Sequence, residues 1–406
     1  PLLSGTYRRE SDEGEVLSIF IDGMGGTFDL RRLEDSEDSP FFPRSWADGA
    51  YAYRPPTPLQ DGWTTGRLES VGMAAAPVEA LVKKILTTPM DAIDAPYIDA
   101  VLVARHGKLV LEEYFHGFRQ EGRHDTRSAS KSLTTTLAGA ALEAGQVSLD
   151  AKVYEVMNGG TLPEGLDPRA ARMTLENLLT MSSGLDCDDW DSTSPGNEDS
   201  LQNQRQQPDW NRFILDLPMV HEPGEHAAYC SGGMSLAGEV IARSVGLPLT
   251  DAFDRYLARP LALGPYSTNL MPNGKAYAGG GLRIRARDFL KFGQLMLDDG
   301  LWQGRRILPQ GWAARATTER HILGSRRPEG YGYGWWLFSY QLGGHTWPAY
   351  YAGGNGGNYI IVVPDLDLAV VILASNYNQN VMHETKYEYI PRYILRSVLE
   401  GTTASR

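Results

Sequence analysis

Apolar runs with strand character stand near both ends of this chain, and patterns typical of helices fill the interval between them. Residues 97–115 predict a β-hairpin, because β-branched and aliphatic runs flank the turn residues His106-Gly107-Lys108. Residues 333–337, 359–363 and 369–373 are the later strand candidates. Helices are expected at 128–144, 175–184, 236–245, 249–261, 287–292 and 390–399.

A chain whose strands come from both ends, with helices between them, is expected to fold as an α+β protein. We predict one antiparallel sheet, flanked by helices and formed by 97–115 together with the strands of 333–375. A helical lobe, from about 130 to 320, is expected beside this sheet. The cleft between the sheet and the lobe is the natural position for a binding site.

Residues 1–66 read differently from the rest and predict an N-terminal extension that is β-rich or irregular. This segment holds a short strand candidate at 17–21, an acidic stretch at 34–38 and the pair Pro55-Pro56. We expect it to wrap the main body, residues 67–406, rather than to hold a core of its own.

Composition excludes several classes of partner. The 406 residues carry a net charge of −12, whereas a nucleic-acid surface is basic. No apolar run approaches the roughly 18 residues that a membrane-spanning helix needs. Metal-ligand patterns such as H-E-x-x-H are absent, and His383-Glu384 is not followed by a second histidine. We therefore expect no cofactor, no metal and a small-molecule partner, while the oligomeric state stays open.

The segment Ser128-Ala129-Ser130-Lys131 precedes a helical stretch rich in Ala, Leu and Thr. Positions three apart on a helix share a face, so Lys131 is expected one turn above the Ser128 hydroxyl. A lysine that is held there, partly desolvated and beside other donors, can lose its proton near neutral pH and activate the serine. The alternative is a helix start with an N-cap serine and a solvated lysine. Chance alone supplies roughly 0.5 such matches in a chain like this, so the context must decide.

Two later segments supply that context. Tyr229-Cys230-Ser231-Gly232-Gly233 follows Pro223-Gly224-Glu225, and Gly353-Gly354-Asn355-Gly356-Gly357 adjoins a strand candidate. With Ser128 and Lys131, in this order, they resemble the motifs of the serine β-lactamase and penicillin-binding-protein superfamily. The chain is most similar to the class C-like branch, which includes family VIII carboxylesterases and 6-aminohexanoate-dimer hydrolase. The resemblance covers roughly residues 60–400 and implies a β-lactamase/transpeptidase-like fold.

The resemblance also implies an acyl-transfer site with Ser128 as the nucleophile. Tyr229, as a phenolate or sharing a proton with Lys131, accepts the serine proton and later delivers it to the leaving group. Lys131 favours the deprotonated tyrosine by its positive charge. The backbone N–H groups of Ser128 and Asn355 form the oxyanion hole. The alternatives are a core aromatic role for Tyr229 and an ordinary tight turn for the glycine run.

The third motif departs from the family pattern. The Lys-Thr-Gly strand of β-lactamases offers a cation and a hydroxyl to the substrate carboxylate, but the matching positions here read Ala352-Gly353-Gly354. We therefore expect a serine hydrolase for small esters or amides, as in carboxylesterases or 6-aminohexanoate-oligomer amidases. The alternatives are a D-aminopeptidase, a weak β-lactamase, or a non-catalytic ligand-binding member of the same fold. A Ser-His-Asp hydrolase is disfavoured because no G-x-S-x-G occurs.

The polar loop at 186–208 is long enough to form a lid over the cleft. Cys187 lies at its start and Cys230 follows Tyr229, so two unpaired thiols and a disulfide that pins the lid both remain open. The disulfide would imply an oxidising compartment, and a periplasmic or secreted location is slightly favoured over the cytoplasm.

Substrate contacts are expected from the lid and from the glycine-rich strand. Glycines around Asn355 allow a substrate to approach the backbone closely. The candidate substrate-binding residues are Trp190, Asp188, Ser231, Gly353, Gly354 and His345. For the two lid residues the alternative is that they are ordinary exposed loop side chains.

Overall fold

The computed structural model describes residues 3–10, 14–21, 26–31, 46–47, 50–92, 94–324 and 327–404. By its contacts the chain divides into two compact units, residues 1–41 and 42–406. The smaller unit holds an antiparallel sheet of β1 (Leu3–Glu10), β2 (Gly14–Ile21) and β3 (Gly26–Arg31). The strand expected at 17–21 lies within β2, while the acidic stretch at 34–38 lies outside the described residues.

This division differs from the boundary at residue 66 that the sequence suggests. β6 (Thr64–Thr65) pairs in parallel with β8 (Lys108–Tyr114) at one edge of the main sheet. The Tyr53 hydroxyl donates a hydrogen bond to the carbonyl of Val110 at 2.7 Å. Residues 50–66 therefore belong to the larger unit, because their strand and side-chain partners lie there.

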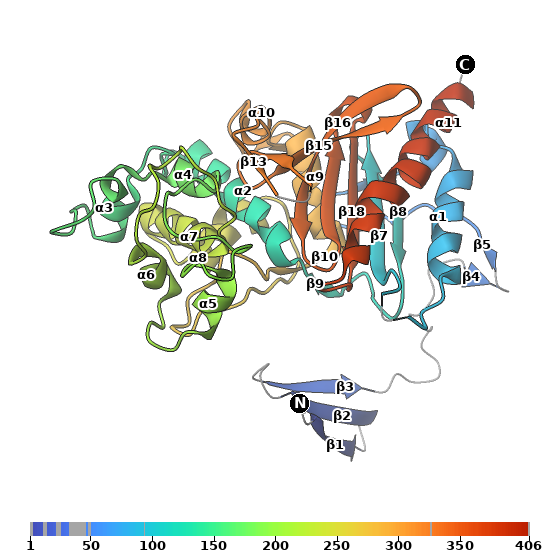
Figure 1. Ribbon diagram of the computed structural model, residues 1–406. Helices are drawn as coiled ribbons and strands as arrows, with labels where there is room; N and C mark the ends of the chain where they lie inside the picture. Colours follow the sequence, from blue (N-terminus) through green and yellow to red (C-terminus); the bar gives the residue numbers. More distant parts are fainter. Residues whose placement is uncertain are drawn as a thin grey trace. The chain divides into compact units, whose positions relative to one another are not determined.

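The larger unit is built on a nine-stranded sheet whose strands come from both ends of its chain segment, which confirms the α+β class (Figure 1). The strand order is β13–β14–β15–β16–β17–β18–β7–β8–β6, and every neighbouring pair except β6 and β8 is antiparallel. The bounds not yet given are β7 (Ile98–Arg105), β13 (His321–Leu323), β14 (Glu329–Tyr331), β15 (Trp336–Leu342), β16 (His345–Gly354), β17 (Asn358–Val363) and β18 (Leu368–Ala374).

Helices cover both faces of the central strands. α9 (Ala286–Leu297) contacts β7, β17 and β18 on one face, and Ile360 and Val371 point into that core. Ile361 and Val370 point into the opposite core, which α1 (Ala75–Thr87), the π-helix Thr385–Leu395 and α11 (Arg396–Ala404) complete (Figure 1). Because both faces are covered, the central strands read as continuous apolar runs instead of alternating ones.

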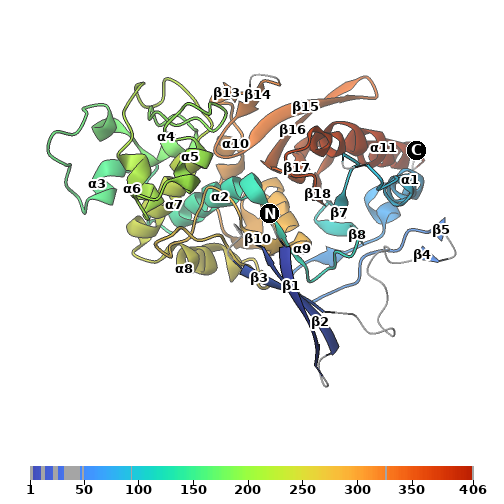
Figure 2. The ribbon, with the colours of Figure 1, turned by 60° about the horizontal axis from the view of Figure 1, so that its bottom comes forward.

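The interval between the early and late strands forms the helical lobe. Its helices are α2 (Ser130–Glu143), α3 (Val153–Met157), α4 (Leu175–Leu179), α5 (Glu198–Asn203), α6 (Trp210–Leu215), α7 (Ser231–Val245) and α8 (Leu249–Phe253). In both views α2 lies between the other helices of the lobe and the sheet, and it contacts α7 and β16 (Figures 1 and 2). It is buried on almost every side, and Gly139 lets it approach Trp312, where a Cβ would lie 2.5 Å from the indole.

Shorter elements connect these layers. They are β4 (Trp46–Ala47), β5 (Ala50–Tyr51), β9 (Arg123–Asp125), β10 (Arg283–Arg285), β11 (Leu301–Trp302), β12 (Arg305–Arg306) and α10 (Trp312–Ala316). Within the described part of the chain, no helix has the length and apolar character needed to cross a bilayer.

Several helix and strand ends differ from the sequence expectation for local reasons. The helix expected at 249–261 ends as α8 at Phe253 and continues as the π-helix Asp254–Ala258. The C-terminal helix begins as a π-helix that contains Pro391, which has no N–H to donate to the regular α-helical ladder. β15 begins only at Trp336, because Gly334 has a φ of 71° and turns the chain just before it.

Candidate active site

Ser128 lies in a tight turn between β9 and α2. The 3-10 helix Arg127–Ala129 contains Ser128 and leads directly into α2. Arg127 has a φ of 50°, a left-handed conformation that is costly for a residue with a side chain. Asp125 supports this conformation, because its Oδ1 accepts a hydrogen bond from the Arg127 N–H at 3.0 Å. The turn leaves Ser128 half-buried at the start of the helix.

Lys131 lies one turn further along and is almost completely buried. Its Nζ donates hydrogen bonds to Ser128 Oγ at 2.9 Å and to the carbonyl oxygen of Gly279 at 2.5 Å. The geometry expected from the Ser-x-x-Lys spacing is therefore present, and the solvated-lysine alternative does not describe this residue.

Tyr229 completes the group from the start of α7. Lys131 Nζ lies 4.9 Å from the centroid of its ring. On the side facing the lid, the Trp190 ring stacks on Tyr229 with centroids 5.1 Å apart and planes 8° apart. Trp336 stacks on the same tyrosine at 5.7 Å. Tyr229 is therefore held between a buried ammonium group and two indole rings.

Opposing influences act on the pKa of Lys131. Burial lowers it, but Tyr229, Glu198 and Asp189 act in the opposite direction, and the net result is a raised pKa. A raised pKa favours the ammonium form, which suits the expected role of Lys131 in stabilising a deprotonated Tyr229 better than direct proton removal by the lysine.

The glycine-rich end of β16 reaches the turn that holds Ser128. A Cβ on Gly354 would lie 2.1 Å from the carbonyl oxygen of Thr126 and 3.1 Å from the backbone nitrogen of Ala129, so only glycine fits. The next residue, Asn355, is fixed through its side chain: its Nδ2 donates to Asn378 Oδ1 at 2.6 Å, and its Oδ1 accepts from the Asn378 N–H at 2.7 Å. The strand end and the Ser128 turn are thus in direct contact.

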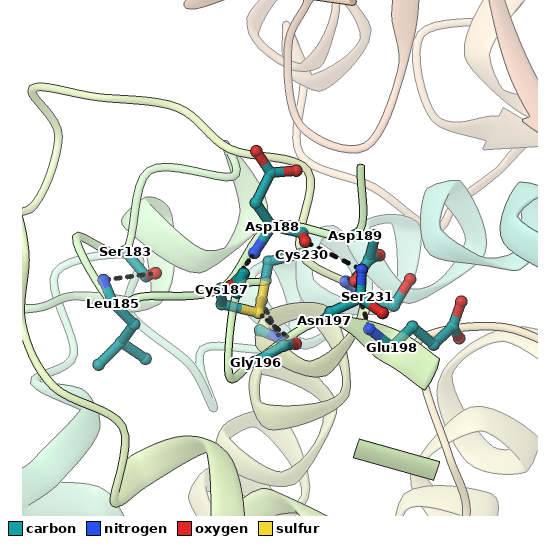
Figure 3. The surroundings of a disulfide bond; sticks show 12 residues. Ser183, Leu185, Cys187, Asp188, Asp189, Gly196, Asn197, Glu198, Cys230 and Ser231 are labelled. Carbon is teal, nitrogen blue, oxygen red and sulfur yellow. Dashed lines mark hydrogen bonds between the residues drawn. A yellow bond between two sulfur atoms is a disulfide. The ribbon is translucent and has the colours of Figure 1, made fainter. Parts of the chain in front are cut away.

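The lid begins with a covalent tie to the Tyr229 segment. Cys187 and Cys230 form a disulfide with a Cα–Cα distance of 5.4 Å (Figure 3). Beyond it the segment 186–208 is well organised, because its side chains cap its own turns and it contains α5. For example, Asn197 caps α5 by accepting a hydrogen bond from the Asp199 N–H. The lid is therefore a folded element over the start of α7.

The candidate substrate contacts fall into different positions. Trp190 is about half exposed beside Tyr229, and Asp188 lies two residues earlier on the same segment. Ser231 is fully buried, and its backbone N–H donates a hydrogen bond to Asp189. Gly353 lies in the strand end next to Gly354.

His345 does not belong to this group. It begins β16, whereas Gly354 ends that strand, and at about 3.3 Å per residue the two lie roughly 30 Å apart. Its ring contacts Trp347 at 5.6 Å. The expectation that His345 lies on the substrate side is therefore wrong, because the extended strand carries it away from the site.

Sequence reasoning missed the acidic residues that act on Lys131. Asp189 and Glu198 come from the lid, and the Tyr277 hydroxyl donates to Glu198 Oε1 at 2.6 Å. One signal was available: Asp189 follows Cys187 by two residues, and Tyr229 directly precedes Cys230. A disulfide between these cysteines necessarily brings Asp189 close to Tyr229.

Comparison with known proteins identifies the family of the chain. The Beta-lactamase family model matches residues 90–392, and the chain belongs to this family. It is 27% identical over 308 residues to 6-aminohexanoate-dimer hydrolase from Paenarthrobacter ureafaciens, covering 70% of this chain and 74% of the relative.

Solved structures share the fold at lower identity. A putative 6-aminohexanoate-dimer hydrolase from Bacillus anthracis matches with a TM-score of 0.62 and 19% identity, over 76% of this chain and 80% of that one. EstCE1, described as a hydrolase with promiscuous acyltransferase activity, matches with a TM-score of 0.62 and 19% identity, over 81% and 99%. The β-lactamase/transpeptidase-like fold is confirmed, and the chain belongs to a superfamily of serine hydrolases.

Over the residues that the structure describes, no group of three or more His, Cys, Asp or Glu side chains is arranged to hold a metal ion. The chemistry available at the site is that of a serine hydroxyl, a buried ammonium group, a phenol and backbone N–H groups.

Proposed function

We propose that this chain hydrolyses small esters or amides through an acyl-enzyme on Ser128. The observation that carries the proposal is the 2.9 Å contact between Lys131 Nζ and Ser128 Oγ, made by a lysine whose Nζ also lies 4.9 Å from the centroid of the Tyr229 ring. A serine used only as a helix cap would not need a buried ammonium group beside its hydroxyl.

In the first step, Ser128 Oγ attacks the acyl carbon while its proton passes to the Tyr229 phenolate oxygen. The Lys131 ammonium group stabilises the phenolate before the transfer, which suits its raised pKa. The negative charge that develops on the carbonyl oxygen is bound by the N–H groups of Ser128 and Asn355. Collapse of the intermediate expels the alcohol or amine, which takes its proton from Tyr229.

In the second step, water attacks the acyl group and gives its proton to Tyr229. Ser128 Oγ leaves as the departing oxygen and recovers a proton from the tyrosine, so the starting state is restored. Each group is used twice, and no cofactor enters the cycle.

The substrate class follows from what surrounds this centre. Ala352-Gly353-Gly354 offers neither a cation nor a hydroxyl to a substrate carboxylate, so efficient β-lactam hydrolysis is not expected. Trp190 and Trp336 give the site aromatic walls beside Tyr229. A small ester or amide with an apolar portion suits these walls, in keeping with the carboxylesterase or 6-aminohexanoate-oligomer amidase reading.

The decisive experiment is labelling with a fluorophosphonate probe, followed by mapping of the modified residue. The wild-type chain should be labelled at Ser128 and the Ser128→Ala variant should not. Ser132→Ala is the matched control, because Ser132 lies on the same helix with its hydroxyl bound to the Gly334 carbonyl. Equal labelling of wild type and Ser128→Ala, or none in either, would favour the non-catalytic ligand-binding alternative.

A hydrolysis panel then separates the enzyme alternatives. Short-chain p-nitrophenyl esters and a 6-aminohexanoate dimer test the proposed class, D-amino-acid amides test an aminopeptidase, and a chromogenic cephalosporin tests a β-lactamase. We expect turnover of the esters or the dimer and slow or no turnover of the cephalosporin.

A further inference from the structure

The carboxylate of Asp189 is built into the start of the helix that follows Tyr229. Its Oδ2 accepts a hydrogen bond from the Ser231 N–H at 2.8 Å, and its own N–H donates to the Tyr229 carbonyl at 2.8 Å (Figure 3). Its Oδ1 accepts from the Glu198 N–H at 3.0 Å, at the start of α5. One residue of the lid therefore bridges two helix starts and the backbone of Tyr229.

The disulfide fixes this arrangement. Cys187 lies two residues before Asp189, and Cys230 lies between Tyr229 and Ser231. The covalent bond and the two backbone hydrogen bonds of Asp189 thus join the same two short segments. Trp190, the next residue, covers the Tyr229 ring. The lid segment and the segment of Tyr229 are consequently held in a fixed position relative to each other.

Asp189 also belongs to the charge environment of Lys131. The ionisable groups that face it are Lys131 from α2, Glu198 from α5, Tyr229 before α7 and Tyr277 from the loop that follows the lobe. Burial raises the pKa of Asp189 to about 6, against the opposing effect of Lys131 and the Ser231 hydrogen bond. The carboxylate is therefore largely ionised at neutral pH, and burial makes its charge effective at Lys131.

We propose that Asp189 is a positioning residue that fixes the Tyr229 segment against the lid and places a negative charge beside the Lys131–Tyr229 pair. It acts through Lys131 and Tyr229 and needs no contact with substrate. The inference rests on the proposed function, since it concerns the proton balance of the same site. Glu198 adds a second negative charge from the lid and holds the Tyr277 hydroxyl.

The sign of the pH effect follows from the charge. An anion beside the Lys131–Tyr229 pair stabilises every proton that the pair binds, so it moves both limbs of the kcat/KM profile to higher pH. Asp189→Asn removes the anion but keeps the size of the side chain. Both limbs should then move to lower pH by about one unit, and turnover at pH 8 should fall.

The test measures kcat/KM of a p-nitrophenyl ester from pH 5 to 10. Asp189→Glu keeps the charge and should retain the wild-type limbs even if its maximum rate falls. Asp191→Asn is the matched control, because Asp191 is an exposed carboxylate of the same lid whose Oδ1 accepts hydrogen bonds from the N–H and hydroxyl of Thr193. Its profile should superimpose on that of the wild type.

If Asp189→Asn does not fold, Glu198→Gln is the second variant, and a smaller shift to lower pH is expected. Unshifted limbs in Asp189→Asn, or in Glu198→Gln where that variant replaces it, would overturn the inference, as would an equal shift in Asp191→Asn. Failure of the proposed function looks different: the wild type itself would not be labelled at Ser128 by a fluorophosphonate, and the inference would fall with it.

Discussion

At the scale of single residues, the proposed site is a small cluster of side chains around a buried lysine. The Ser128, Lys131 and Tyr229 side chains were predictable, because their types and order match a family pattern. Asp189 was not, because an aspartate in a polar loop has no sequence signal until the disulfide brings it to Tyr229. The position of His345 was predicted wrongly because it is close to Gly354 in sequence, with eight residues between them. These residues form an extended strand, so the two ends lie far apart in space.

Tyr229→Phe should lower kcat by about 10²- to 10⁴-fold and leave KM nearly unchanged, because the hydroxyl moves a proton and the ring keeps its stacking on Trp190 and Trp336. Steady-state kinetics on a p-nitrophenyl ester measure this. A variant with a normal kcat and a raised KM would show that the tyrosine binds substrate and does not transfer protons.

Lys131→Ala should nearly abolish acylation of Ser128, because the phenolate would lose the ammonium group that stabilises it. The pre-steady-state burst of p-nitrophenol, which is released during the first turnover, reports acylation directly. Activity that survives with only a displaced pH optimum would mean that another group activates the serine. A far-ultraviolet circular dichroism spectrum like that of the wild type checks that the variant is folded.

At the scale of elements, the sheet was easier to predict than the helices. Strands β17 and β18 are continuous apolar runs bounded by turns, and this pattern has few other interpretations. The ends of the helices were harder to predict, because they depend on single residues such as Pro391 inside the C-terminal helix. The approach of the β16 end to the Ser128 turn is a long-range contact, and only the glycines hinted at it.

Gly354→Ala tests that approach. The added Cβ would lie 2.1 Å from the Thr126 carbonyl, so the strand must move away from the Ser128 turn. We expect a loss of about 1–3 kcal/mol in the free energy of unfolding, measured in urea, and a loss of about 10²- to 10³-fold in turnover as the oxyanion site opens. Gly280→Ala is the matched control, because its Cβ would lie 3.6 Å from Arg127, an ordinary contact. Similar losses in both variants would contradict a specific role for the strand end.

The disulfide makes a separate prediction for the lid. It closes a loop with a sequence separation of 43 residues, for which chain entropy gives a stabilisation of about 4 kcal/mol. The Cys187→Ser/Cys230→Ser double variant should therefore unfold at lower urea concentration and acylate more slowly, because Asp189 and Trp190 lose their covalent tie to Tyr229. Unchanged acylation in the double variant would show that the hydrogen bonds of Asp189 suffice to hold the lid.

At the scale of the whole molecule, the residues of the proposed site and the sheet that carries them all lie in the unit that begins at Phe42. The sequence suggested a later boundary, at residue 66, because the stretch before it, with the pair Pro55-Pro56, looks like a β-rich or irregular extension. Composition does not reveal that this stretch supplies partners to the main core. Arg287 is nearly fully buried, and its Nη1 lies 3.0 Å from Asp61 Oδ2 while its Nη2 donates to the Thr57 carbonyl at 2.9 Å.

Two truncations distinguish these boundaries. Removal of residues 1–41 should leave the urea midpoint of the larger unit and the labelling of Ser128 close to those of the full chain. Removal of residues 1–66 also deletes β6 and two partners of Arg287, which keeps its ion pair with Glu112 at 3.1 Å, and the loss of a buried charged partner costs at most about 3–5 kcal/mol. The shorter protein should therefore be markedly less stable or fail to fold. Equal stability of both truncations would place the boundary at residue 66, whereas lost labelling without residues 1–41 would show that the N-terminal unit contributes to the site.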